Sequence, residues 1–294
     1  MQSRTTMPGL TPERLVALVL LLLLPSAMSA AVQPDLTFAR VDGQELKLDL
    51  YLPDDAKPVG LIVWVHGGAW RGGARSSVDV KGLTAFGWAI ASVDYRLSTV
   101  ARFPAQVHDI KAAIRYLRAN AARFGYPADR FVVGGSSAGA HLAALVGVSN
   151  GLAELEGGVG DSPRVSSDVQ GILDLYGASD LTTILGQSTP HGLSVRVPAL
   201  DLLLGGQPAA VPDLARLASP VFQLDPRDPP LFLVHGGSDP QMPPEQSRQL
   251  AAAYEKLGRP LHFEIIPGAK HGGPEFVTEA QLRAMDAFFR AQLK

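Results

Sequence analysis

Short, continuously apolar segments recur along this chain and constrain its fold more than any other feature. They are residues 61–65, 89–93, 131–133, 169–175 and 231–234, interrupted only by single polar residues. Segments of this kind are typical of strands buried on both faces of a parallel sheet. Residues 46–52 instead alternate leucine with Lys, Asp and Tyr, which predicts a half-buried strand.

Amphipathic segments lie between these predicted strands. Apolar residues recur at three- and four-residue spacing over residues 107–121, and we expect further helices over 244–257 and 279–292. Regular alternation of strand and helix predicts an α/β fold, with a mostly parallel central sheet and helices on both faces. In such a fold the ligands bind at the carboxyl ends of the strands.

The N-terminal segment has the order of a secretory signal peptide. Arg4 and Arg14 precede the apolar run Leu15–Leu24, and Pro25 and small residues come after it. We therefore predict a signal peptide over residues 1–30 and a single domain over residues 31–294. The apolar run is about half as long as a bilayer span, so no stable membrane anchor is expected. The mature protein is expected to be secreted or periplasmic.

Composition excludes several classes of function. The formal net charge is -2 over 294 residues, so nothing favours nucleic acid as a partner. The chain has no cysteine, which excludes disulfides, thiolate metal sites and cysteine nucleophiles. We expect no metal and no other cofactor.

A serine lies where nucleophilic chemistry would need it. Ser137 is the centre of Gly135-x-Ser137-x-Gly139, between an apolar strand and an alanine-rich helix. The glycines permit a sharp turn that exposes the hydroxyl, and the helix N-terminus aims free N–H groups at developing negative charge. The motif alone has low specificity, so its partners decide the interpretation.

A histidine and a carboxylate at the same sheet edge would complete a catalytic triad. His271 lies in a glycine-containing loop after the apolar segment around residues 262–266, and Asp239 comes after the strand 231–234. The chain order Ser137, Asp239, His271 is the one found with this serine motif. A turn-capping role is the structural alternative for Asp239, and Asp180 is the reserve candidate for the acid.

Backbone amides for an oxyanion hole are predicted at two places. His66-Gly67-Gly68-Ala69-Trp70 comes directly after the buried strand 61–65, and successive glycines let N–H groups point inward. The N–H of Ala138, directly after the serine, should complete the hole. A phosphate-binding loop is the alternative, but the glycines have no Lys-Ser/Thr pair after them.

At these residues the chain resembles the α/β-hydrolase superfamily, and within it the exported carboxylesterases that include acetyl-xylan and feruloyl esterase-like proteins. The resemblance extends from about Thr37 to the C-terminus. The motifs that carry it are His66–Trp70, Asp94–Leu97, Phe103–Gln106, Asp109, Gly135–His141 and the loops at Asp239 and His271.

The resemblance implies a role for each of these motifs. Ser137 is the nucleophile, Asp239 and His271 complete the triad, and the oxyanion donors are Gly67, Gly68 and Ala138. Asp94-Tyr95-Arg96 is expected to brace the loop under the site. Where related lipases have a third glycine, this chain has Ala69 and then Trp70, a pattern shared with formamidase-like members. Trp70 is expected to contact the substrate.

We therefore expect an exported serine esterase that cleaves short-chain carboxylic esters, such as acetyl or feruloyl esters of carbohydrate, through an acyl-enzyme. An aryl-formamidase or a peptidase-like amide hydrolase is the alternative, and a non-catalytic binding protein is a third. The Gly- and Ser-rich segment 150–167 and the segment 182–212 are expected to fold over the site. The sequence does not indicate a long exposed apolar helix of the kind that forms a lipase lid, so we expect a site for short acyl chains.

Overall fold

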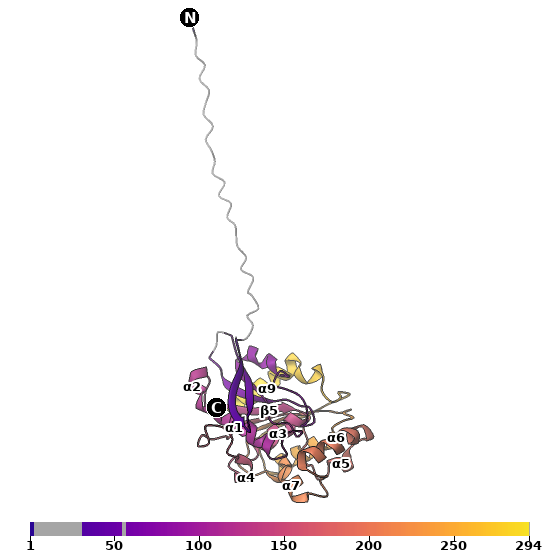
Figure 1. The fold of residues 1–294 in the computed structure, drawn as a ribbon. Helices are drawn as coiled ribbons and strands as arrows, with labels where there is room; N and C mark the ends of the chain where they lie inside the picture. The colour runs from indigo at the N-terminus through magenta and orange to yellow at the C-terminus, as the bar shows by residue number, and fades with distance from the viewer. Residues whose placement is uncertain (3–30, 55–56, 294) are drawn as a thin grey trace.

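The computed structural model describes residues 1–2, 31–54 and 57–293 of the chain, so most of the predicted signal peptide lies outside the described residues. A central sheet of eight strands has the order β1-β2-β4-β3-β5-β6-β7-β8. Helices lie around this sheet (Figure 1). The strands are β1 (Ala31–Val41), β2 (Gln44–Leu52), β3 (Gly60–Val65), β4 (Trp88–Val93), β5 (Phe131–Ser136), β6 (Gly171–Leu175), β7 (Leu231–Gly236) and β8 (Leu261–Ile266).

The pairing of strands β3 to β8 is parallel throughout, while β1 and β2 add an antiparallel edge. The predicted α/β fold with a mostly parallel sheet is therefore confirmed. Strand β1 has no counterpart in the sequence-based prediction. It contains Pro34, and its pairing shifts register twice, between Gln33 and Leu36 and again between Thr37 and Ala39. These irregularities interrupt the two-residue period by which a strand is recognised.

Helices connect the strands and cover the sheet. They are η1 (Lys81–Phe86), α1 (Ala105–Ala119), α2 (Ala121–Phe124), α3 (Ala138–Gly147), α4 (Ala153–Glu156), α5 (Ile184–Gln187), α6 (Pro190–Leu204), α7 (Pro212–Leu217), η2 (Pro220–Phe222), α8 (Glu245–Lys256), η3 (Pro274–Val277) and α9 (Glu279–Gln292). Within the described ranges, none of them is long and apolar enough to cross a bilayer.

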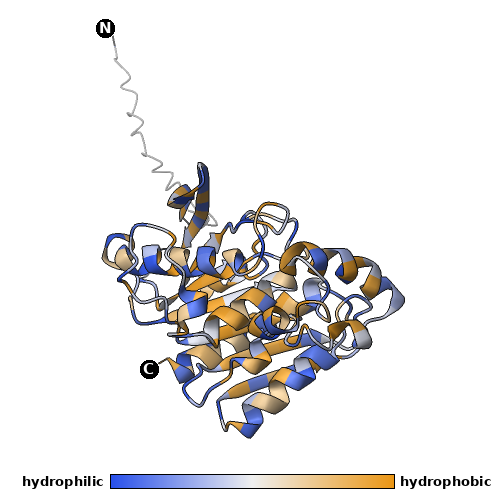
Figure 2. Ribbon diagram, turned by 60° about the horizontal axis from the view of Figure 1, so that its bottom comes forward, coloured by the Kyte–Doolittle hydropathy of each residue, from blue (hydrophilic) through white to orange (hydrophobic). Residues whose placement is uncertain are grey.

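The sheet separates two apolar cores because successive side chains of a strand point to opposite faces. In β3, Leu61 and Val63 pack into the core shared with α1, α3 and α8, whereas Ile62 and Trp64 pack against η1 and α9. Figure 2 shows apolar residues concentrated in the central strands and polar residues on the outer faces of the helices. Burial on both faces explains why β3 reads as an uninterrupted apolar run.

The helices α5, α6 and α7 form a separate group beside the sheet (Figure 1). They belong to the connection between β6 and β7. Because β6 is parallel to β5, this connection leaves the sheet at the same edge at which β5 ends and α3 begins.

Close packing between β3 and α3 predicts a specific sensitivity at Gly139. An added Cβ there would lie 2.0 Å from the carbonyl oxygen of Val65, which is backbone and cannot rotate away. We expect Gly139→Ala to lower the free energy of unfolding by about 1–3 kcal/mol in denaturant titrations. Gly186→Ala in α5 is the control, since nothing lies within 4 Å of its added Cβ. Equal effects of the two substitutions would contradict this packing.

Candidate active site

Ser137 occupies a strained turn between β5 and α3. Its φ of 55° and ψ of -119° are rare for a residue with a side chain. The flanking glycines make the turn possible, because an added Cβ on Gly135 would lie 2.4 Å from the carbonyl carbon of Gly139. The turn lifts the serine hydroxyl above the carboxyl edge of the sheet, as the motif predicted.

Three side chains distant in sequence meet at this edge. Nδ1 of His271 lies 2.6 Å from Oδ2 of Asp239, and Nε2 of His271 lies 2.8 Å from Oγ of Ser137. A carboxylate can only accept a hydrogen bond, so Nδ1 carries the proton and Nε2 is free to accept from the serine hydroxyl. This arrangement prepares His271 to remove the proton of Ser137.

Asp239 is held in its ionised form. Burial disfavours the charge, but hydrogen bonds from His235, His271 and the backbone N–H of Met242 outweigh it, and the pKa of Asp239 lies well below its ordinary range. Its second oxygen, Oδ1, accepts from the N–H groups of Gln241 and Met242, each at 2.8 Å. Asp239 is thus both the turn-capping residue and the partner of the imidazole.

A second histidine beside Asp239 was not identified from the sequence. His235 lies near the end of strand β7 and is fully buried, with Nδ1 at 2.6 Å from Oγ of Ser247 and Nε2 at 3.4 Å from Oδ2 of Asp239. Its Nε2 also lies 3.1 Å from the carbonyl oxygen of Met242. The sequence does place His235 shortly before Asp239, at the end of the same strand, and this position could have indicated the contact. We assign it a positioning role for the carboxylate.

The predicted oxyanion loop lies against the serine turn. An added Cβ on Gly67 would be 3.4 Å from Cβ of Ser137, and Gly68 has a φ of +116° that favours glycine. Ala138 is the first residue of α3, so its N–H has no acceptor within the helix. Backbone donors therefore flank the hydroxyl from two elements.

The residues below the oxyanion loop brace it. The Tyr95 hydroxyl donates to the carbonyl of His66 at 3.2 Å, and the two rings stack with centroids 4.5 Å apart. Arg96 forms two hydrogen bonds of 2.8 Å with the carboxylate of the buried Asp109. These contacts agree with the structural role that the resemblance implied for this motif.

Trp70 and His141 connect the oxyanion loop to the opposite wall of the site. The Trp70 indole N–H donates to Nδ1 of His141 at 3.0 Å, so Nε2 of His141 carries a proton and donates to the carbonyl of Ala218 at 2.7 Å. Trp70 is 2% exposed. Its polar atom is therefore engaged within the protein, and the residue also lines the cavity beside the serine.

A cavity of about 10 Å³ adjoins the serine. It is enclosed by the oxyanion loop, the serine turn, α6 and the loop after Asp239. Its lining residues are Ala69, Trp70, Ser137, Ala138, Val195, Arg196, Ala199, Gln241 and Met242. The expectation that the segment 182–212 folds over the site is met by α6, which supplies three of these residues.

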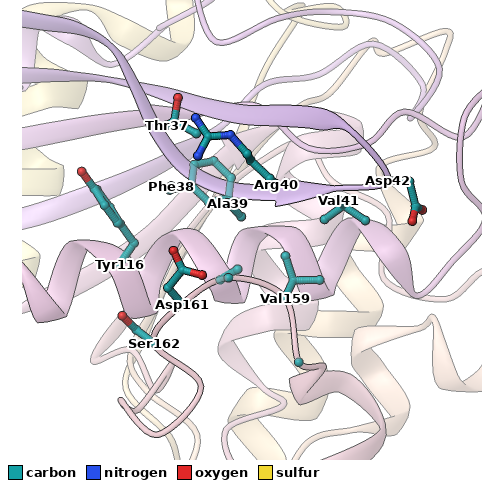
Figure 3. Close-up of a pocket in the computed structure, with 13 residues that line it drawn as sticks. Thr37, Phe38, Ala39, Arg40, Val41, Asp42, Tyr116, Val159, Asp161 and Ser162 are labelled. Atoms are coloured by element: carbon teal, nitrogen blue, oxygen red, sulfur yellow. The ribbon is translucent and has the colours of Figure 1, made fainter.

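The expectation for the segment 150–167 is wrong. Glu156 bonds Lys111 of α1 at 2.6 Å, and residues 158–162 line a separate groove of about 540 Å³ against β1 and α1 (Figure 3). Neither Ser137 nor His271 lines that groove. This segment lies away from the site because of the direction of α3. The helix runs from the carboxyl edge of the sheet to the amino edge, and residues 150–167 come after it.

Asp180, the reserve candidate for the acid, does not approach the imidazole. Its Oδ1 accepts from the N–H of Thr182 at 2.9 Å and from the hydroxyl of Thr182 at 2.6 Å. It closes the turn after β6.

Fold and site together define an α/β-hydrolase in which an aspartate is hydrogen-bonded to a histidine and the histidine to a serine. The family model BD-FAE matches residues 48–254, so the chain belongs to the BD-FAE family. The resemblance to α/β-hydrolase esterases seen in the sequence is therefore confirmed.

Individual relatives support the same classification. Esterase LipC of Mycobacterium tuberculosis is 31% identical over 238 residues, covering 76% of this chain and 56% of LipC. The chain spans little more than half the length of such curated relatives.

Among the solved structures that match nearly end to end are two carbohydrate-related hydrolases. A truncated carbohydrate esterase from gut microbiota has 29% identity and a TM-score of 0.82, covering 91% of this chain and 98% of that one. An acetyl ester-xyloside bifunctional hydrolase from Caldicellulosiruptor lactoaceticus has 25% identity and a TM-score of 0.72, with coverages of 90% and 96%.

The burial of His141 predicts a pH effect on stability. Burial lowers the pKa of His141 from 6.5 to about 4, so the unfolded chain binds the proton more readily. Stability from this neutral imidazole is therefore present above pH 6.5 and is lost as the pH falls toward 4, by on the order of 3 kcal/mol.

The measurement is the free energy of unfolding at about pH 7.5 and about pH 4.5, for the wild type and for His141→Gln. We expect the acid-induced loss to be smaller by about 2–3 kcal/mol in His141→Gln. His191→Gln, at an exposed position, is the control and should retain the wild-type difference. An unchanged acid-induced loss in His141→Gln would refute the assignment.

Proposed function

We propose that this protein is a serine esterase that hydrolyses short-chain carboxylic esters. The observation that carries the proposal is the hydrogen-bonded chain from Asp239 through His271 to Ser137. The backbone donors beside the serine and the names of the relatives support the same chemistry. No observation favours an amide substrate over an ester.

The proposed reaction has two halves. Oγ of Ser137 attacks the ester carbonyl while Nε2 of His271 takes the hydroxyl proton, and the alcohol then leaves with that proton. Water next attacks the acyl-serine with His271 as the base, which releases the acid and restores the hydroxyl. The N–H groups of Gly67, Gly68 and Ala138 would stabilise the oxyanion in both halves. Ionised Asp239 stabilises the imidazolium that forms.

The small cavity beside Ser137 favours the shortest acyl groups, of which acetyl is one. The ring of Trp70, together with Val195 and Ala199 of α6, leaves little room beside the nucleophile. An acetylated carbohydrate is the substrate class that best combines this small acyl pocket with the carbohydrate esterase among the structural neighbours. Export through residues 1–30 would bring the enzyme to such a substrate.

The nucleophile assignment predicts the effect of one substitution. Ser137→Ala should lower kcat for 4-nitrophenyl acetate by on the order of 10⁴-fold or more, because no other hydroxyl replaces the nucleophile. The folded structure should persist, as measured by circular dichroism and denaturant unfolding. Ser194→Ala, on an exposed part of α6, is the control and should retain wild-type activity. A Ser137→Ala variant with wild-type turnover would end the assignment.

The cavity volume predicts acyl-chain selectivity. From 4-nitrophenyl acetate to hexanoate, kcat/KM should fall by about tenfold or more, because each further methylene must displace packed side chains. Val195→Ala should reduce that fall by enlarging the cavity. Val197→Ala, at an exposed position of the same helix, is the matched control and should not change it. A wild-type preference for hexanoate would contradict the assignment of this cavity.

A further inference from the structure

Arg196 is a buried cation at the site that the proposed reaction does not use. It belongs to α6 and is 2% exposed, and it lines the same small cavity as Ser137. Burying a guanidinium is costly unless strong acceptors replace the water it loses. The acceptors around Arg196 therefore decide how the residue should be interpreted.

Those acceptors are few and weak. Nη2 contacts the thioether sulfur of Met242 at 3.0 Å, and Nη1 lies 3.5 Å from the carbonyl oxygen of Gly192. Nε is buried and has no hydrogen-bond partner among the described residues. Among the ion pairs of the described residues, none includes Arg196. Most of the five N–H donors of the guanidinium thus lack a good acceptor.

Three other buried or half-buried arginines have stronger acceptors than Arg196, although Nε of Arg115 also lacks a partner among the described residues. Each of the three has a carboxylate or several carbonyl oxygens as acceptors. Those acceptors are Asp109 for Arg96, Glu156 for Arg115, and the carbonyls of Ala128, Ser166 and Asp168 for Arg118. Arg196 departs from this pattern, and it does so beside the nucleophile.

Asp239, the acidic group whose charge acts on Arg196, cannot serve as its partner. Asp239 attracts Arg196 electrostatically, but its Oδ1 is occupied by two backbone N–H groups and its Oδ2 by His271. Burial lowers the pKa of Arg196 to about 10, and the charge of Asp239 opposes that effect. The side chain remains a cation at neutral pH with no acidic partner of its own among the described residues.

We propose that Arg196 forms an anion subsite that recognises a carboxylate carried by the substrate close to the scissile ester. The inference rests on the proposed function, because it takes Ser137 as the nucleophile. A guanidinium binds a carboxylate through two charge-assisted hydrogen bonds and gains the acceptors that it lacks in the free protein. The carboxylate can belong to the acyl group, as in a half-ester of a dicarboxylic acid, or to the alcohol, as in an acetylated uronic acid.

The test compares each carboxylate substrate with its uncharged amide. On the acyl side the pair is mono-4-nitrophenyl succinate and its terminal amide. On the alcohol side the pair is 3-acetoxybenzoate and 3-acetoxybenzamide. We expect the wild type to favour the carboxylate by about tenfold or more in kcat/KM within one pair. The pair that responds identifies which side of the ester carries the charge.

Variants assign that preference to the guanidinium. Arg196→Gln should bring the ratio of carboxylate to amide close to one, and Arg196→Lys should retain part of it because the charge remains. Arg123→Gln removes the same charge from an exposed position on α2 and should keep the wild-type ratio. A ratio unchanged in Arg196→Gln overturns the proposal. Since the wild-type ratio is measured on the folded enzyme, the test holds even if a variant does not fold.

The subsite and the proposed function fail in different ways. A wild type that hydrolyses both members of each pair at equal rates overturns the subsite and leaves the esterase assignment intact. A wild type that hydrolyses none of these esters, nor 4-nitrophenyl acetate, overturns both.

Discussion

The strained backbone at Ser137 is the constraint on which the rest of the site depends. A residue with a side chain at a φ of 55° persists only where its surroundings hold it. Here the surroundings are the contacts of β5 and α3 with β3, which approach closely enough that only glycine fits at positions 135 and 139. The packing of the sheet therefore fixes the direction of the hydroxyl, and the histidine loop meets it there.

The partners of Ser137 are positioned by the same sheet edge. Strands β7 and β8 are parallel to β5, so the loops after them emerge beside the serine turn. Two backbone N–H groups hold one carboxylate oxygen of Asp239, and the other oxygen contacts the imidazole of His271. The geometry is thus set by backbone hydrogen bonds and burial, and little rearrangement is needed when an ester binds.

Sequence reasoning succeeded where burial or chain order carries the information. Strand β3 can be predicted from its sequence because both of its faces are buried and its residues are all apolar. Ser137, Asp239 and His271 can be predicted because they lie at strand ends in a recognisable order. It failed where the outcome depends on direction or on long-range contacts. The position of residues 150–167 depends on the direction in which α3 crosses the sheet, and the residue pattern of the segment itself does not carry that information. The role of Arg196 depends on its neighbours in space, since it lies in no motif. The position of His235 shortly before Asp239 is visible in the sequence, but its contact with the carboxylate is not.

The central claim is that Ser137 is activated as a nucleophile by His271. The most direct measurement is mass spectrometry of the protein after exposure to a fluorophosphonate, which reacts with activated serines. We predict one added phosphonyl group, located on the peptide that contains Ser137, and no addition in a His271→Asn variant. An unlabelled wild type, or a label on another serine, would contradict this mechanism.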